Sequence, residues 1–403
     1  MKTLVVVKTG WSLSHRMLAF RTFAARGWRI AVMDRALNQS LRVADVAVTC
    51  DLSATAGAVR ALLARAGRPD GILTFSDSAL AATARLADAL GLPFLPVAVA
   101  DRVTDKRRQR ELFAAAGLPV PDWRRLVDEE EAAAAVRDWG RTVIKPADRA
   151  ASVAVRLVDT VEAARQAYRE AARAARQGGA VLAERYLVGP EVSVESIAVD
   201  GQQRAVCVTD KVTTHGPHFV ELGHAVPSAL EPASRERVVE AARLACCALG
   251  LGWGACHTEV KLTEAGPVVV EVNARLPGDS VPDLIELALG VNVYELLGRH
   301  ALGETISLAD LAPRRRAGAA IHFLPSAAGT FLGATSPLEA EPPDWLVELS
   351  VTASPGHRLE EPVSNSDRIG YAIACGGDSP EAAARALSAV GSVAVRTASE
   401  PGG

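Results

Sequence analysis

Short apolar runs alternate with longer amphipathic stretches in residues 1 to about 100. The runs fit strands buried inside a sheet, and the alanine-rich stretches between them fit helices. Alternation of this kind is typical of a parallel, doubly wound sheet. The predicted strands are Leu4–Val7, Trp28–Met33, Val46–Thr49, Gly71–Phe75 and Leu92–Leu95, and the predicted helices are 14–26, 53–66 and 78–90.

The pattern of the next two hundred residues is that of a mixed α+β unit. A helix begins after Val103, with Thr104 or Asp105 as its N-cap, and ends at Gly117. From Glu191 to Val208 apolar residues recur at every second position, which predicts antiparallel strands. The other predicted elements are strands at 142–145 and 180–186, helices at 160–177, 232–249 and 281–289, and a strand pair over 256–273.

A smaller piece follows Pro313. Asp378 is a predicted helix cap, with Pro380 at the first helical position. The tail 398–403 is expected to be disordered. The predicted strands are Ala317–Leu324, Leu346–Thr352, Ile369–Ala374 and Ser392–Thr397.

Composition narrows the class of protein. The 403 residues carry a net charge of −3, which gives no electrostatic footprint for nucleic acid or an anionic membrane. No stretch approaches the ~20 apolar residues of a membrane span, and the N-terminal apolar run is too short for a signal peptide. The six cysteines show no Cys-x-x-Cys spacing. These features predict a cytoplasmic protein without structural disulfides.

The first strand–turn–helix unit argues against a dehydrogenase. Asp34 ends the second predicted strand, where a dinucleotide fold would hold its ribose. However, the first turn reads Lys8-Thr-Gly-Trp-Ser12 in place of the G-x-G-x-x-G fingerprint.

A predicted hairpin over 257–275 carries the most informative polar residues. Its two β-rich runs flank Glu264-Ala-Gly266, a three-residue loop with glycine at the left-handed position. In that register Glu259 lies opposite Glu271, with Cβ atoms ~4.5–5.5 Å apart. Like charges at that separation normally destabilise a sheet.

The period of two then places Glu271, Asn273 and Arg275 on one face, whereas Val270 and Val272 point into the core. A hard divalent ion resolves the repulsion, because Mg²⁺ combines one or two carboxylates with substrate phosphates. Two such ions can lie ~3.5–4 Å apart, bridged by a shared carboxylate. The hairpin therefore predicts a metal site.

The alternative is an exposed hairpin face whose carboxylates pair with Lys261 or Arg275. Other segments favour a phosphate site. Lys106 lies near a helix start, where a lysine and the helix dipole both attract phosphate, and Lys145 emerges at the end of an apolar strand. The segment Glu184–Leu187 ends another strand, whose edge can offer backbone groups to an adenine.

Taken together, these residues resemble the ATP-grasp superfamily, and within it the L-amino-acid ligase or carboxylate–amine ligase branch. The resemblance runs from about residue 1 to 397 and implies an ATP-grasp fold of α/β and α+β class. It also implies that the protein binds ATP together with two Mg²⁺ ions, for which Mn²⁺ can substitute. The implied divisions are an N-terminal doubly wound parallel-sheet (pre-ATP-grasp) domain at 1–102, lobe A at 103–187, lobe B with the metal site at 188–312, and a small C-terminal α+β subdomain at 313–397.

The same resemblance implies roles for single residues. The implied nucleotide-binding residues are Lys106, Lys145, Ser152, Glu184, Arg185, Tyr186, Leu187, Glu191 and His224, with adenine at Glu184–Leu187 and ribose at Glu191. The implied metal ligands are Glu259, Glu271 and Asn273, and the implied catalytic residues are Arg275, His218, Glu221 and Asp279. Arg275 would steady the transferred phosphate, and one of the other three would assist the amine. A histidine in a strand-rich segment is as often a packed residue, which leaves His218 and His224 open.

The loop after Lys145 departs from the family pattern. That loop is usually rich in glycine and serine, but residues 145–156 contain no glycine. Alanine restricts positive φ and the close approach of backbone to phosphate. Ser152 is the hydroxyl donor that the loop keeps, and how the loop closes over ATP is in question.

The implied activity is peptide-bond formation between a small carboxylic acid and an amine, by default two amino acids, through an acyl phosphate with release of ADP. Two alternatives stay open. The first is another ATP-grasp enzyme, such as a carboxylase-type component that phosphorylates bicarbonate. The second is a nucleotide-binding module without ligase activity. The acid and the amine are not specified, and a homodimer is the common assembly of the superfamily.

Overall fold

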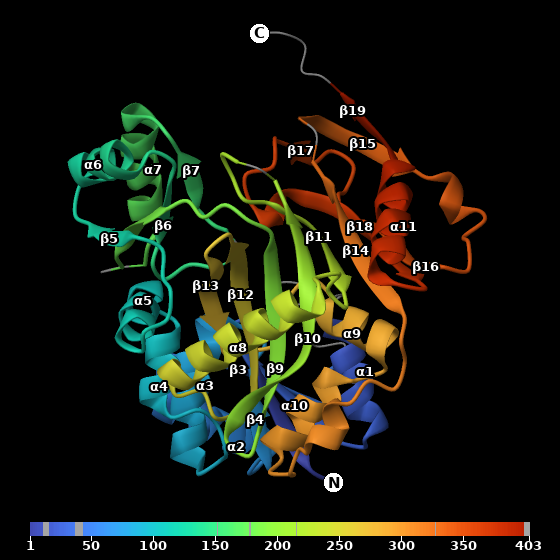
Figure 1. Cartoon of the computed structure of the whole chain (residues 1–403). Coiled ribbons are helices and arrows are strands. Elements are labelled where there is room, and N and C mark those ends of the chain that lie inside the picture. The colour runs from blue at the N-terminus through green and yellow to red at the C-terminus, as the bar shows by residue number, and fades with distance from the viewer. Residues whose placement is uncertain are drawn as a thin grey trace.

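The computed structural model describes residues 1–10, 16–36, 43–150, 152–176, 179–214, 216–326 and 328–398. In Figure 1 the N-terminal sheet and its helices lie at the bottom, a four-stranded sheet stands at the upper left, and the last strands lie at the upper right. A long central sheet connects these parts. Ala398, the first residue of the tail predicted to be disordered, is instead the last residue of a strand, and the rest of that tail, 399–403, lies outside the described residues.

The N-terminal sheet is parallel and doubly wound, as the apolar pattern predicted. Its strand order is β3-β2-β1-β4, and every strand pair in it is parallel. Leu4 and Val6 pack toward the first helix, whereas Val5 and Val7 pack toward the next two. The elements are β1 (Thr3–Val7), α1 (Met17–Ala25), β2 (Arg29–Asp34), β3 (Val46–Thr49), α2 (Thr55–Ala66), β4 (Gly71–Leu73) and α3 (Asp77–Leu90).

The strand predicted at Leu92–Leu95 is wrong. This segment has no regular structure and leads into α4 (Val97–Val103), which the apolar pattern did not predict. Pro93 and Pro96 lack the N–H groups that a sheet ladder needs. Leu95 is nevertheless buried, so the apolar residues of this run pack in the interior although the segment does not pair with a strand.

The helix α5 (Lys106–Ala115) begins at Asp105, whose side chain accepts hydrogen bonds from the backbone of Arg107 and Arg108. This settles the predicted choice of N-cap in favour of Asp105. Beyond α5 lies a four-stranded sheet of order β5-β8-β6-β7. Its elements are β5 (Trp123–Leu126), α6 (Glu129–Trp139), β6 (Thr142–Pro146), β7 (Arg156–Val158), α7 (Val161–Ala174) and β8 (Val181–Arg185).

The central sheet has eight antiparallel strands in the order β13-β12-β9-β10-β11-β14-β18-β16. The edge strand β13 pairs only with β12 in this sheet and carries the predicted metal ligands. The strands are β9 (Glu191–Val199), β10 (Gln202–Thr213), β11 (Glu221–Val226), β12 (Ala255–Thr263), β13 (Gly266–Asn273), β14 (Gly318–Pro325), β16 (Leu346–Val351) and β18 (Arg368–Gly376).

Helices cover the central sheet. The helix α8 (Pro232–Leu249) buries an apolar face against β12 and β13, and α9 (Val281–Leu289) and α10 (Val293–Ala301) join the core that also holds α1. Asp378 caps α11 (Ser379–Gly391), as predicted from the proline that follows it. A small sheet of order β17-β15-β19 completes the described chain, with β15 (Gly329–Thr335), β17 (Arg358–Leu359) and β19 (Ala394–Ala398).

The predicted division at 102, 187, 312 and 397 stays a prediction. One feature bears on it, because β14, β16 and β18 continue the sheet that the predicted lobe B begins. All six cysteines are free thiols. Within the described ranges, no helix is both long enough and apolar enough to cross a bilayer.

Candidate active site

The hairpin of β12 and β13 places Glu259 opposite Glu271, which confirms the predicted pairing. The route to that register differs from the prediction. Thr263 pairs with Gly266, so the loop contains two residues, and a bulge between Glu259 and Val260 restores the offset. The extra residue is Val270.

The bulge also corrects the predicted facing of Val270, whereas Val272 packs in the core as predicted. Val270 was expected in the core but lines a cavity together with Glu271. Val269 and Val272 are the valines that pack in the core, at 2% and 0% exposure. A bulged strand turns two successive side chains toward one side, so strict alternation fails at that point.

Lysines neutralise the two opposed carboxylates. Lys106 Nζ lies 2.8 Å from Glu271 Oε1, and Lys211 Nζ lies 3.3 Å from Glu259 Oε2. Burial alone raises the pKa of Glu259, but Lys211 and His257 outweigh it and hold the pKa below its usual range. The sequence-based alternative named Lys261 and Arg275 as partners, and the structure gives these roles to other cations.

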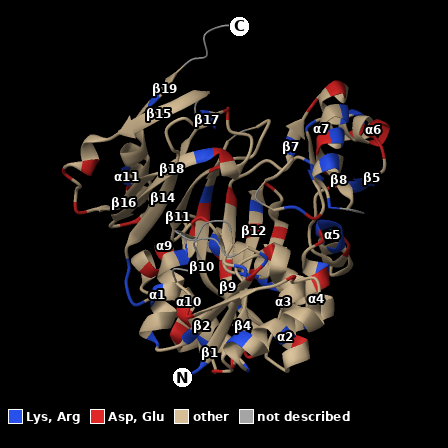
Figure 2. Ribbon diagram, turned by 180° about the vertical axis from the view of Figure 1, so that it is seen from behind, with Lys and Arg blue, Asp and Glu red and all other residues tan. Residues whose placement is uncertain are grey.

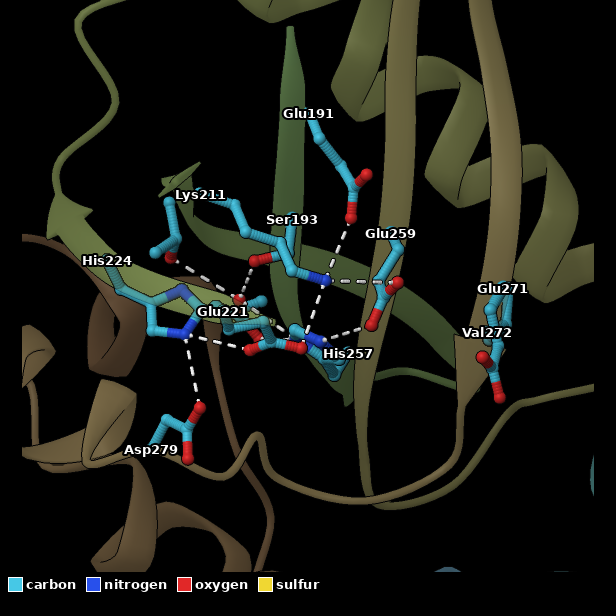
Figure 3. A network of polar contacts seen from close by, with 12 residues as sticks. Glu191, Ser193, Lys211, Glu221, His224, His257, Glu259, Glu271, Val272 and Asp279 are labelled. Atoms are coloured by element: carbon cyan, nitrogen blue, oxygen red, sulfur yellow. Dashed lines mark hydrogen bonds and ion pairs between the residues drawn. The ribbon is translucent and has the colours of Figure 1, made fainter. Parts of the chain in front are cut away.

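Lys211 is the hub of a carboxylate network (Figure 3). Its Nζ lies 2.8 Å from Glu191, 3.3 Å from Glu221 and 3.3 Å from Glu259. Burial lowers the pKa of Lys211, but these three carboxylates outweigh it and hold the pKa well above the usual value. Lys211 therefore stays charged and occupies the space between acids from three strands.

Glu184 joins two cations on the opposite wall. Its carboxylate lies 2.9 Å from Arg110 Nε and 2.7 Å from Lys145 Nζ. Burial by itself raises the pKa of Glu184, but the two cations hold it at about 2. Because the Glu184 side chain is paired with Arg110 and Lys145, an adenine would have to hydrogen-bond to the backbone of β8 and not to this carboxylate.

These walls enclose a cavity of about 920 Å³, part of it open to solvent. Figure 2 shows acidic and basic residues close together on the strands around β12. An apolar part of the wall contains Tyr186, Leu187 and Phe219, and the rings of Tyr186 and Phe219 stack 6.3 Å apart. The predicted residues that line the cavity are Lys106, Lys145, Ser152, Glu184, Arg185, Tyr186, Leu187, Glu191, Glu221, Glu259 and Glu271.

Five predicted residues lie outside this lining. Asn273 is buried on β13 opposite His257. Arg275 Nε is 2.6 Å from Asp77 of α3. Burial lowers the pKa of Arg275, but Asp77 outweighs it and raises the pKa above the usual value. The backbone of His218 forms an isolated antiparallel β-bridge with the backbone of Arg156. Burial, and then the charge of Arg156, lower the pKa of His218.

The other two, His224 and Asp279, form a cluster with Glu221. His224 Nε2 lies 3.1 Å from Glu221 and 3.4 Å from Asp279 (Figure 3). Arg368 donates two hydrogen bonds to Asp279, of 2.7 and 2.8 Å. Burial lowers the pKa of His224, but Asp279 and Glu221 outweigh it and raise the pKa.

Oxygen donors at two places bear on metal binding. Glu259 and Glu271 face the cavity from adjacent strands, and Asn273 follows on β13. Carboxylate and amide oxygens of this kind fit Mg²⁺. The atoms of Glu221, His224 and Asp279 also lie within 4.8 Å of one another. Cations pair with the acids at both places, Lys106 and Lys211 at the hairpin and Lys211 and Arg368 at the cluster. The two places differ in exposure to the cavity, because Glu259 and Glu271 both line it, whereas His224 and Asp279 do not.

The glycine-free loop adopts the conformation that glycine would favour. Ser152 has φ +56° and Ala154 has φ +55°. Left-handed backbone costs a non-glycine residue roughly 1–2 kcal/mol. The loop therefore holds two non-glycine residues in the left-handed region at a cost in stability, and Ser152 lines the cavity.

Several site residues escaped the sequence analysis, namely Arg110, Lys211, Arg368 and the pair Glu195 and His257. Arg110 follows Lys106 by four residues on a predicted helix, so the two share a face, and this spacing is a signal that was present. Lys211 ends a period-two run, and the acids it pairs with, Glu191, Glu221 and Glu259, lie at least ten residues away in sequence. Glu195 is 2% exposed and accepts a 2.9 Å hydrogen bond from His257, its partner on the neighbouring strand, which lies 62 residues away in sequence.

Residues 103–279 match the family described as the ATP-grasp domain, and residues 25–94 match the ATP-grasp N-terminal domain. The chain belongs to the ATP-grasp superfamily. Residues 322–398 match the L-amino acid ligase C-terminal domain 2, which places this ATP-grasp protein in the L-amino-acid ligase branch.

Curated relatives and solved structures agree with this placement. A protein of Sinorhizobium fredii is 30% identical over 75% of this chain and 63% of its own length. Alanine–anticapsin ligase of Bacillus subtilis is 29% identical over 57% of this chain and 53% of its own length. Carnosine synthase 1 of Gallus gallus is 31% identical over 81% of this chain and 37% of its own length.

This ATP-grasp chain therefore spans less than two thirds of each of these three relatives. Over nearly its whole length it has the fold of the L-amino acid ligase from Bacillus licheniformis, with a TM-score of 0.84, 21% identity and 99% coverage of both chains.

Proposed function

We propose that this protein is an ATP-dependent carboxylate–amine ligase that forms an amide bond and releases ADP and phosphate. The observation that carries the proposal is the cavity in which Lys106, Lys145 and Lys211 face Glu259 and Glu271 of the hairpin. Phosphoryl transfer needs this combination of cations for the phosphates and oxygen donors for divalent ions.

The distribution of apolar and charged residues in the cavity lining supports one orientation of the nucleotide. Tyr186, Leu187 and Phe219 form an apolar wall that suits adenine, and Glu191 lies beside them for the ribose. Lys106 and Lys145 would then meet the phosphates. Glu259, Glu271 and Asn273 would hold Mg²⁺, which when bound neutralises phosphate charge and aligns an in-line transfer.

The reaction that fits has two steps. A carboxylate oxygen of the acid attacks the γ-phosphorus of ATP, and the bond between that phosphorus and the β,γ-bridging oxygen breaks. The products of this step are an acyl phosphate and ADP. The amine nitrogen then attacks the acyl carbon, loses a proton, and the carbon–oxygen bond to phosphate breaks. The protein positions both reactants and neutralises the moving charge.

The substrate class follows from the relatives and from the cavity. Alanine–anticapsin ligase and the L-amino acid ligase family of the C-terminal match carry amino acids in their names, which supports amino-acid substrates here. Among His218, Glu221 and Asp279, Glu221 lines the cavity, so we assign contact with the incoming amine to Glu221. His224 and Lys211 hold its carboxylate in place.

A phosphate-release screen tests the proposal. Amino acids and other carboxylic acids are paired with amines in the presence of ATP and Mg²⁺, and products are identified by mass spectrometry. We expect ADP, phosphate and an amide in equal amounts. AMP as the nucleotide product would exclude the acyl-phosphate route. Phosphate release that depends on bicarbonate alone would favour the carboxylase-type alternative, and ATP binding without turnover would favour a non-catalytic module.

A further inference from the structure

Arg110 is the largest side chain that is completely buried in the described chain. It lies on α5 and lines the cavity beside Lys106 and Lys145. Its Nε is 2.9 Å from Glu184 on β8, and its Nη2 donates a 2.6 Å hydrogen bond to the backbone oxygen of Val270. One guanidinium thus connects the four-stranded sheet to the bulge in the hairpin.

The third nitrogen of this guanidinium is unpaired. Arg110 Nη1 is buried and has no hydrogen-bond partner. Buried donors without an acceptor are uncommon because desolvation is not compensated, and a charged donor is the most costly kind. Because Arg110 lines the cavity, a ligand bound there can supply the missing acceptor.

The local charge balance shows what kind of acceptor is missing. Arg110 and Lys145 share the single carboxylate of Glu184, which leaves one positive charge in excess. Lys106 does not change this balance, because Glu271 pairs with it. A buried surplus of positive charge in a cavity wall favours an anionic ligand.

We propose that Arg110 is a nucleotide-contact residue, whose Nη1 donates a hydrogen bond to a phosphate oxygen of the bound nucleotide. This rests on the proposed function for the identity of the ligand. The same guanidinium holds the Val270 carbonyl, so phosphate binding and the strand that carries Glu271 meet at one side chain. Arg110 also orients Glu184 and, through it, Lys145.

A series of nucleotides that differ only in their number of phosphates distinguishes this role from a purely structural one. Titration calorimetry measures the dissociation constants of adenosine, AMP and ADP, without Mg²⁺ or acid and amine. The variants are Arg110→Lys, which keeps the charge, and Arg110→Met. The matched control is Arg108→Met on the exposed face of the same helix, whose side chain is 49% exposed.

Both Arg110 variants should bind adenosine within about twofold of wild type, and should lose roughly 10- to 100-fold in affinity for ADP, the size expected for a hydrogen bond to a charged group. Arg108→Met should match wild type on every ligand. Equal losses for adenosine and ADP would overturn the proposal, because they indicate a general defect. Unchanged ADP affinity in Arg110→Lys and Arg110→Met would overturn it as well.

Two further results keep the test decisive. If both single variants unfold, Arg110→Gln, which is neutral and leaves Glu184 paired with Lys145, replaces them, and the same selective loss of ADP affinity is expected. If wild type binds adenosine and ADP equally, the nucleotide site itself is wrong and the proposed function fails with it. If wild type prefers ADP and the variants keep that preference, the role of Arg110 alone fails.

Discussion

Glu184 shows at the scale of a residue how a buried carboxylate couples stability to pH. Its folded-state pKa is about 2, below the ordinary value of 4.5, because Arg110 and Lys145 outweigh the effect of burial. A depressed pKa means that the stabilisation is fully present above pH 4.5 and is lost as the pH falls toward 2. The shift corresponds to a stabilisation on the order of 3 kcal/mol.

We therefore expect Glu184→Gln to be less stable than wild type near pH 7, and the difference to shrink as the pH falls from about 4.5 to about 2. Urea denaturation across that pH range measures it. Glu240→Gln is the control, because Glu240 pairs with Arg243 on an exposed helix face and should change little at any pH. A difference that does not depend on pH would contradict the assignment.

Arg275 carries a second prediction at this scale. Arg275→Ala should lower turnover roughly 10²- to 10³-fold with little change in nucleotide affinity, by analogy with the loss of a transition-state hydrogen-bond donor. Steady-state kinetics and ADP titration together measure both quantities. Because Arg275 pairs with Asp77 in this structure, Asp77→Asn serves as a comparison that perturbs the ion pair and keeps the arginine. Wild-type turnover in Arg275→Ala would remove this residue from the mechanism.

At the scale of elements, α5 completes the free edge of the central sheet. Gln109 donates to the Val272 oxygen at 2.9 Å and accepts from the Val272 N–H at 2.9 Å, in the way a neighbouring strand would. Gln109 and Arg110 follow Lys106 by three and four residues, so the three share one face of the helix, and they reach Val272, Val270 and Glu271 respectively. The helix thereby holds the strand that carries the predicted metal ligands.

Gln109→Leu should destabilise the protein by at least about 3 kcal/mol, because three buried backbone groups, the Val103 and Val272 oxygens and the Val272 N–H, lose this partner at about 1–3 kcal/mol each. Chemical denaturation measures the loss. Gln166→Leu is the control, since its amide bonds Glu170 on an exposed face of α7. A cost below that of the control would mean that water satisfies β13 equally well.

The loop between β6 and β7 provides a prediction of opposite sign. Ala154 has φ +55°, so Ala154→Gly relieves left-handed strain and should stabilise by about 0.5–1 kcal/mol after the added flexibility of the unfolded chain. Ala150 in the same loop does not have a positive φ, so Ala150→Gly should destabilise. Thermal unfolding of both variants tests the pair. Destabilisation by both would mean that the strain at Ala154 is absent.

At the scale of the whole molecule, the cavity lies where α5, the four-stranded sheet and the central sheet meet. A ligand that binds there stabilises the folded state, by about 2.7 kcal/mol at a hundredfold excess over its dissociation constant. We expect ADP to raise the melting temperature, and Mg²⁺ to raise it further. The predicted homodimer and cytoplasmic location stay predictions.

Glu271→Gln should keep the effect of ADP on the melting temperature and lose most of the added effect of Mg²⁺, because the hairpin then has one carboxylate fewer for the ion. Differential scanning calorimetry measures both increments. Glu264→Gln, in the exposed loop of the same hairpin, should behave like wild type. A full Mg²⁺ increment in Glu271→Gln would place the metal elsewhere.

The sequence by itself determined the parts of this protein that depend on local periodicity. The alternating runs of the first hundred residues predicted a parallel sheet, and the helices at 232–249 and 281–289 begin and end as predicted. The pairing of Glu259 with Glu271 also followed from spacing, although a two-residue loop and a bulge combine to produce it. Adjacent strands are close in sequence there, so few alternatives competed.

Only the tertiary structure decided which charges meet. Lys106 and Glu271 are 165 residues apart, and Arg275 and Asp77 are 198 apart, so no local pattern relates them. The same is true of Lys211, which neutralises acids from three strands, and of Arg110, which joins two sheets. Side-chain periodicity shows which face of an element is buried. Which element covers that face depends on packing across the whole fold, and the charge balance of the cavity depends on it as well.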